Sequence, residues 1–86
     1  MGTVNDEILR ATGGPTVPDG LRSWYLSHGA SSGTLQDMER QFLLALYVGG
    51  TEEMTIADLW RGFLIQSGYI TGTLQDKQLQ YWTQQP

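Results

Sequence analysis

The stretch Gly33-Thr34-Leu35-Gln36-Asp37 returns at residues 72–76 with the same five letters. A threonine at the N-cap of a helix accepts a hydrogen bond from the backbone N–H three residues later, and an acid at that third position reaches back to the N–H of the cap. The same Thr-x-x-Asp spacing occurs at three further places. We therefore predict five helix starts, capped by Thr3 with Asp6, Thr16 with Asp19, Thr34 with Asp37, Thr55 with Asp58, and Thr73 with Asp76.

Length and charge restrict the class of protein. With 86 residues and a mass of 9.6 kDa the chain has room for one small domain. Five Lys and Arg against nine Asp and Glu give a formal net charge of -4. This is the wrong sign for binding a phosphate backbone, so we expect no nucleic-acid partner. The chain has no Cys, which rules out disulfides and thiolate chemistry.

No stretch of the sequence predicts a membrane segment or a leader. The longest apolar run, residues 42–48, is far shorter than the roughly 20 residues that cross a bilayer. The first residues lack the basic and apolar regions of a secretory signal. We therefore expect no membrane partner and no export signal.

Apolar spacing between the caps predicts an all-α fold of five short helices. The first runs from residue 3 to about 11, the second from 16 to about 27, and the third from 34 to about 48, and the others begin at 55 and 73. The third is the longest and most apolar, with Leu46 included in its buried face, and we expect it to be central. The first has a thin apolar stripe, which predicts a docking helix that depends on its neighbours for order.

Residues 16–43 align with residues 55–82 at a constant offset of 39 without a gap. An internal duplication of a helix-loop-helix hairpin is the economical explanation. We predict a single helical domain made of an N-terminal docking helix (1–14), a first hairpin repeat (15–50) and a second hairpin repeat (51–86).

The polar residues indicate structure more than chemistry. The Asp of four caps also precedes an Arg by three or four residues, which predicts the surface pairs Asp6–Arg10, Asp19–Arg22, Asp37–Arg40 and Asp58–Arg61. His28, the one histidine, lacks signposted partners and suits a helix C-terminus. Glu52 and Glu53 fall in a short loop, where solvated acids are typical. We predict no catalytic, cofactor or metal site.

Nine large aromatic residues are many for so short a chain. Those seven residues after each cap-following apolar residue should face inward. Tyr25 and Trp82, one step further round, and Tyr69, in a loop, could instead be exposed anchors for a protein surface or a sugar. The candidate interface consists of Val4, Ile8, Tyr25, Tyr69, Tyr81 and Trp82.

The five caps, together with the run from residue 68 to Asp76 and the Tyr81-Trp82 pair, carry a resemblance to small repeat-containing helical virion proteins of tailed bacteriophages. In those proteins a glycine-containing turn, a Ser/Thr-Leu-Asn-Asp helix start and an aromatic-Trp end recur. The present chain departs at the third motif position, where Asn5 alone matches. The other four caps have Pro18, Gln36, Ala57 and Gln75 there.

The resemblance implies a non-enzymatic accessory structural protein of a phage virion, most plausibly a minor tail protein that docks on other virion proteins. It also implies several copies or a homo-oligomer in the particle, with the chain made in the host cytoplasm. Two alternatives stay open. One is a head decoration or head-tail joining protein, and the other is a cell-wall glycan-binding module that uses the exposed aromatic rings.

Overall fold

A computed structural model describes residues 3–86, which form five α-helices. The all-α prediction is confirmed, and no strand occurs among the described residues. Residues 1 and 2 of the predicted docking segment lie outside them. The helices are α1 (Val4–Thr12), α2 (Val17–Ser27), α3 (Leu35–Leu46), α4 (Ile56–Gln66) and α5 (Leu74–Gln84).

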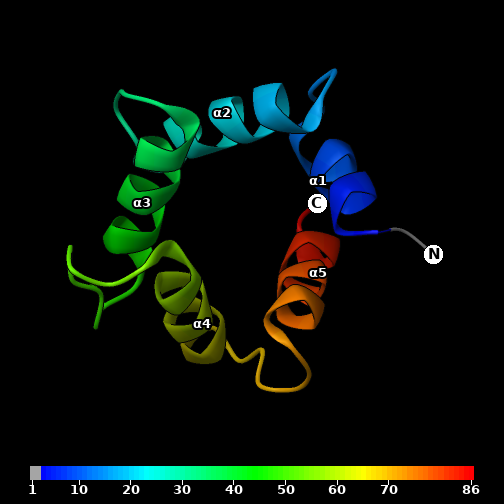
Figure 1. The fold of residues 1–86 in the computed structure, drawn as a ribbon. Helices are drawn as coiled ribbons and strands as arrows, with labels where there is room; N and C mark the ends of the chain where they lie inside the picture. Colours follow the sequence, from blue (N-terminus) through cyan, green and yellow to red (C-terminus); the bar gives the residue numbers. More distant parts are fainter. Residues whose placement is uncertain (1–2) are drawn as a thin grey trace.

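The helices form a closed ring, with the chain passing once around it (Figure 1). Each helix packs against the next in sequence, and α5 returns to pack against α1. The result is a disc of 32 × 32 × 18 Å. The expectation of a central α3 is wrong. In the ring α3 contacts only its two neighbours α2 and α4 through its backbone, and its remaining apolar face points to side chains in the centre.

All five predicted threonine caps are present. In each case the Thr hydroxyl accepts from the backbone N–H of the Asp three residues later. The reciprocal bond of the capping box forms in α1, α3 and α5. In α2 the Asp19 carboxylate accepts the Thr16 hydroxyl instead, and in α4 Asp58 pairs with Arg61 at 2.9 Å. The repeated motif therefore fixes where each helix begins.

The two inter-helix loops at the offset of 39 share their hydrogen bonds. In the first loop the Ala30 N–H donates to the Tyr25 carbonyl at 2.9 Å. In the second loop the Tyr69 N–H donates to the Leu64 carbonyl, also at 2.9 Å. Gln41 Nε2 donates to the Ser32 carbonyl, and Gln80 repeats this bond to Thr71. This recurrence is a similarity of local geometry. An ancestral duplication stays a prediction.

The glycine before the second GTLQD cap illustrates why the loop sequence repeats. Gly72 has a φ of 88°, in the left-handed region, and a Cβ there would lie 2.7 Å from the Asp76 Cβ. Any larger residue would therefore displace the side chain that completes the capping box. Gly33 and Asp37 repeat the arrangement, with 2.8 Å in place of 2.7 Å.

Ring closure depends on α1. Ile8 is buried in the core, and the Arg10 guanidinium donates to three carbonyls at the end of α5, those of Trp82, Thr83 and Gln85. These donated bonds satisfy carbonyls at the end of a helix that has no basic residue in its own last turn, and Glu7 of α1 holds the guanidinium through a 2.8 Å ion pair. The thin stripe of α1 is thus supplemented by polar contacts.

Only one of the four predicted Asp–Arg pairs forms, that between Asp58 and Arg61. Arg10 pairs with Glu7 instead of Asp6, because the Asp6 carboxylate accepts from the Thr3 N–H in its capping box. Arg40 donates to backbone carbonyls, and no ion pair is found for Arg22 within residues 3–86. Cap formation and tertiary contacts therefore outcompete weak surface pairs along a helix.

Candidate functional site

The structure buries most of the aromatic and aliphatic residues that the sequence suggested as an interface. Tyr25 and Trp82 are each 1% exposed, and Tyr81 and Ile8 are also buried. Val4 and Tyr69 are partly buried and pack against the core. The expectation that Tyr25 and Trp82 are exposed anchors is wrong.

The ring arrangement of the helices explains why Tyr25 and Trp82 are buried. A helix that packs on two neighbours and also faces a shared centre buries a wider arc than a helix with one inward stripe. The sequence held a usable signal. At the offset of 39, Tyr25 corresponds to Leu64 and Trp82 to Leu43, and both leucines are fully buried. The internal repeat therefore indicates that Tyr25 and Trp82 belong to the core.

Aromatic rings fill the centre and touch one another in a closed circuit. Successive ring centroids lie between 4.1 and 6.2 Å apart. Such offset and edge-to-face pairs are favourable beyond the area they bury. The circuit runs through Phe42, Phe63, Tyr81, Trp82, Trp24 and His28. These rings stabilise the disc, and Tyr25 packs on Phe42 beside them. Because Tyr25 and Trp82 are buried, neither is available as a glycan platform.

Glu39 is the acid that reaches the aromatic core. Its Oε2 accepts from the Trp60 indole N–H at 2.7 Å and from the Tyr25 hydroxyl at 3.4 Å. Burial raises the pKa of Tyr25 well above its ordinary value, and the neighbouring Glu39 charge raises it further. The carboxylate thus provides an acceptor for polar groups that the core would otherwise leave unpaired.

A second polar spot joins α2 and α5. Burial raises the pKa of Tyr81 to about 12, and the nearby Trp24 indole N–H opposes that rise. The Trp24 Nε1 is buried and makes no hydrogen bond among the described residues. His28, at the C-cap of α2, stacks on Trp24 with centroids 4.1 Å apart and places Nδ1 2.7 Å from the Trp24 carbonyl. These contacts give His28 a packing and capping role.

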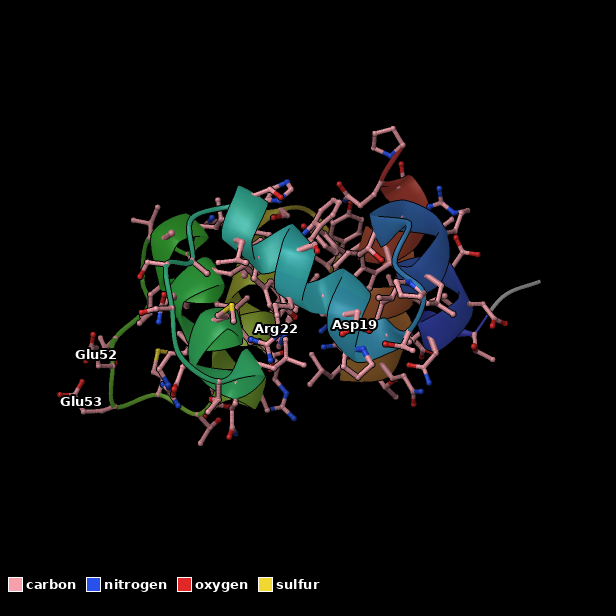
Figure 2. The ribbon with its side chains drawn as sticks, turned by 90° about the horizontal axis from the view of Figure 1, so that it is seen from above. Asp19, Arg22, Glu52 and Glu53 are labelled. Atoms are coloured by element: carbon pink, nitrogen blue, oxygen red, sulfur yellow. The ribbon has the colours of Figure 1, made fainter. Side chains whose placement is uncertain are left out.

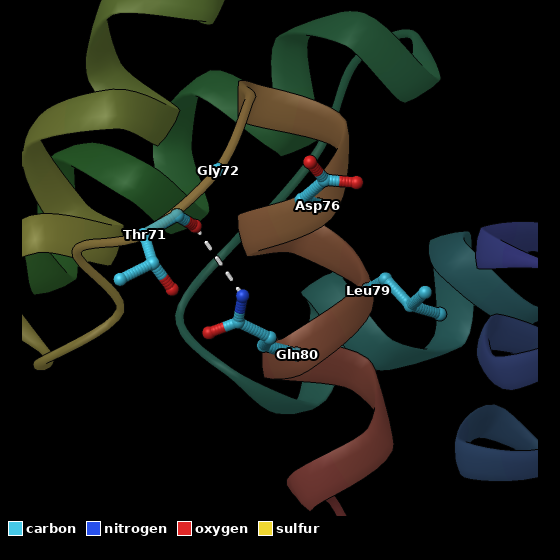
Figure 3. Close-up of a pocket in the computed structure, with 5 residues that line it drawn as sticks. All are labelled: Thr71, Gly72, Asp76, Leu79 and Gln80. Carbon is cyan, nitrogen blue, oxygen red and sulfur yellow. Dashed lines mark hydrogen bonds between the residues drawn. The ribbon is translucent and has the colours of Figure 1, made fainter.

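A pocket of about 390 Å³ lies between the α4–α5 loop and the exposed side of α5 (Figure 3). Gln80 Nε2 crosses it to the Thr71 carbonyl at 3.3 Å. The one titratable lining group, Asp76, is already bound to the Thr73 N–H at 3.0 Å. With no second acid or base in its lining, the pocket has no pair of groups for proton transfer. Its lining residues are Thr71, Gly72, Asp76, Leu79 and Gln80.

None of the described helices combines the length and apolar character needed to cross a membrane. No group of three or more His, Asp or Glu side chains within residues 3–86 is placed to hold a metal ion.

Exposed aliphatic side chains gather where α3 and α4 end. Val48 is 92% exposed, Ile65 51% and Leu46 39%. Gln66 links the two helix ends, because its Oε1 accepts from the Val48 N–H at 3.0 Å and its Nε2 donates to the Leu46 carbonyl at 2.9 Å. We call Leu46, Val48 and Ile65 the α3–α4 corner. Leu46 was expected in the core, but it is exposed at the end of α3, whereas Leu43 in the same turn is buried.

Comparison of the chain with protein-family models, with curated proteins and with solved structures found no match at a significant level.

Proposed function

We propose that this protein is a non-enzymatic accessory structural protein of a phage virion, in the first place a minor tail protein, and that it docks on another virion protein through the α3–α4 corner. The observation that carries the proposal is the exposure of three aliphatic side chains around one hydrogen-bonded junction. Clustered apolar surface on a small protein is typical of an interaction site. The repeated helix caps and the Tyr81-Trp82 end supply the resemblance to virion proteins.

The chemistry of the chain agrees with a role without catalysis. Glu39 binds Trp60 and Tyr25, and His28 packs on Trp24. These titratable groups therefore stabilise the fold. The docking residues proposed here replace Tyr25 and Trp82, whose burial makes them unsuitable as anchors.

Incorporation into particles tests the proposal. The Val48→Ser variant is produced in place of the unmodified protein during phage growth. The protein content of the purified particles is then measured by mass spectrometry. We expect the variant to keep its helical signal in circular dichroism, since Val48 is exposed, and to be depleted from particles at least about tenfold, as for an interface anchor.

Ile70→Ser is the matched control. Ile70 is 69% exposed, also in a loop, but it is not part of the corner. Its variant should enter particles at the level of the unmodified protein. Particles that contain none of the unmodified protein would contradict a structural role in the virion.

A further inference from the structure

The contact between α1 and α5 is the one junction of the ring that no loop spans. The other neighbouring helices are consecutive in the chain, whereas α2, α3 and α4 all lie between α1 and α5 in the sequence. Figure 2 shows this junction at one edge of the disc, opposite the α3–α4 loop that carries Glu52 and Glu53. Without a connecting loop, the same side-chain contacts can form within one copy or between two copies.

The polar contacts at this junction repeat those of a junction that does have a loop. Arg10, in the last turn of α1, donates to three carbonyls within residues 82–85, at the end of α5. Gln66, the last residue of α4, donates in the same way to the Leu46 carbonyl at the end of α3. The end of α1 thus meets the end of α5 as the end of α4 meets that of α3. We call residues 82–85 the α1 seat.

The helix in this seat is the least anchored of the five. α1 has nine residues, fewer than the roughly 12 that an isolated helix needs for marginal stability. Ile8 is its one fully buried residue, whereas α4 buries four. The Arg10 side chain is 43% exposed, so water competes for its hydrogen bonds. With few buried contacts, α1 should open before the rest of the disc unfolds.

The link between α1 and α2 has one free pivot. Gly13 ends α1 with a φ of 71°, and a Cβ there would have no described atom beyond its chain neighbours within 4 Å. Gly14 is fixed, because its Cβ would lie 2.5 Å from the Cα of Gly20 in α2. A change of torsion at Gly13 therefore swings α1 away while the start of α2 stays in place. The swing gives up the packing of Thr12 on Gly20.

We infer that α1 is a detachable strap and that the α1 of a second copy can take its seat, which gives a dimer with exchanged α1 helices. The occupant is a second copy because every contact that the seat makes is one that α1 of this chain already supplies. Exchange keeps those contacts and changes the backbone at Gly13, which makes it a low-cost route to a dimer. The inference goes beyond the proposed function and uses a surface other than the α3–α4 corner.

A substitution at the pivot tests the inference. A β-branched residue strongly disfavours the left-handed conformation, so Gly13→Val should open the turn that folds α1 back on its own disc. We expect sedimentation velocity to show mainly dimer at concentrations where the unmodified protein is mainly monomer. Gly13→Asn is the matched control, because Asn tolerates this conformation, and it should sediment like the unmodified protein.

The contacts within the dimer identify what is exchanged. In a dimer of Gly13→Val that combines one isotope-labelled and one unlabelled copy, isotope-filtered NMR should detect contacts between α1 of one copy and α5 of the other. Arg10→Ala added to Gly13→Val should raise the dissociation constant of the dimer at least about tenfold, since it removes hydrogen bonds from a charged donor. Lys77→Ala removes one positive charge from the start of α5, away from the seat, and should change that constant little.

Two measurements on the unmodified protein keep the inference testable if Gly13→Val fails to fold. Amides of α1 should exchange with solvent at least about tenfold faster than those of α4. Refolding a mixture of labelled and unlabelled protein at millimolar concentration should give some dimer with contacts between α1 of one copy and α5 of the other.

Three outcomes would overturn the inference. They are a folded Gly13→Val that stays monomeric, a dimer of either protein without contacts between α1 of one copy and α5 of the other, and α1 amides as protected as those of α4. Absence of any dimer after the millimolar refolding would overturn it as well. None of these outcomes affects the α3–α4 corner, which is tested separately by the incorporation of Val48→Ser into particles.

Discussion

The two hairpins, α2–α3 and α4–α5, have the same loop hydrogen bonds but different side chains at the positions that face neighbouring helices. Glu39 in the first hairpin corresponds to Gln78 in the second, and Arg40 corresponds to Leu79. Glu39 binds the core and Arg40 holds the α3–α4 loop. The helix-cap sequence is therefore the same in both hairpins because the local geometry is the same. The residues that contact neighbouring helices differ because those neighbours differ.

The largest expected effect concerns the centre that both hairpins share. Phe42→Ala and Phe63→Ala should each lower the free energy of unfolding by roughly 3 to 5 kcal/mol, enough to unfold an isolated domain of this size. Both side chains are buried, and their ring centroids lie 6.0 Å apart. Urea denaturation measures the loss. A cost below about 1 kcal/mol for either variant would show that the ring centre does not hold the hairpins together.

Alkaline pH should destabilise the protein through one tyrosine of each hairpin, Tyr25 and Tyr81. The pKa of Tyr81 is raised to about 12 and that of Tyr25 is raised more strongly, so the folded protein holds these protons where the unfolded chain releases them, above about pH 10. Stability is therefore full below pH 10 and falls as the pH rises towards 12. Tyr81 alone accounts for up to roughly 2 to 3 kcal/mol.

Urea denaturation at pH 9 to 12 follows this loss. Tyr81→Phe removes one of the two ionisations, so its stability should fall less steeply over this range. A stability that stays constant up to pH 12 in the unmodified protein would contradict the burial of both hydroxyls.

Glu39 sharpens the contrast between the hairpins. Glu39→Leu leaves the Trp60 indole N–H without its acceptor and should cost roughly 2 kcal/mol. Glu39→Gln keeps an acceptor and should cost less. Gln78, at the corresponding position of the second hairpin, makes no side-chain hydrogen bond within residues 3–86, so Gln78→Leu should change the melting temperature little. Equal costs for Glu39→Leu and Gln78→Leu would remove the asymmetry proposed here.

The smallest effects should be shared by both hairpins. Thr34→Ala and Thr73→Ala each remove the acceptor of an N-terminal N–H and should destabilise the protein by roughly 1 kcal/mol. Thr83→Ala, near the end of α5, should do much less. Thermal melts in which all three variants resemble the unmodified protein would contradict the role of the repeated motif.

The start of each helix was predictable from the sequence alone, because it depends on contacts that span three residues. A threonine and an aspartate at that spacing satisfy N–H groups whatever the rest of the chain does, so all five caps were predictable. The inward positions of Phe42 and Phe63 followed from helical periodicity in the same way.

Only the tertiary structure decided which residues are exposed. Arg10 binds the Trp82 carbonyl at the end of α5, and the Trp82 ring packs on Trp24 of α2. Neither contact is visible in a local pattern, because the partners are far apart in the sequence. Leu46 is exposed although it continues the apolar face of α3, because the packing of α3 against α2 and α4 leaves it uncovered. The candidate docking surface is thus a product of how the helices meet, which depends on side-chain packing across the whole disc.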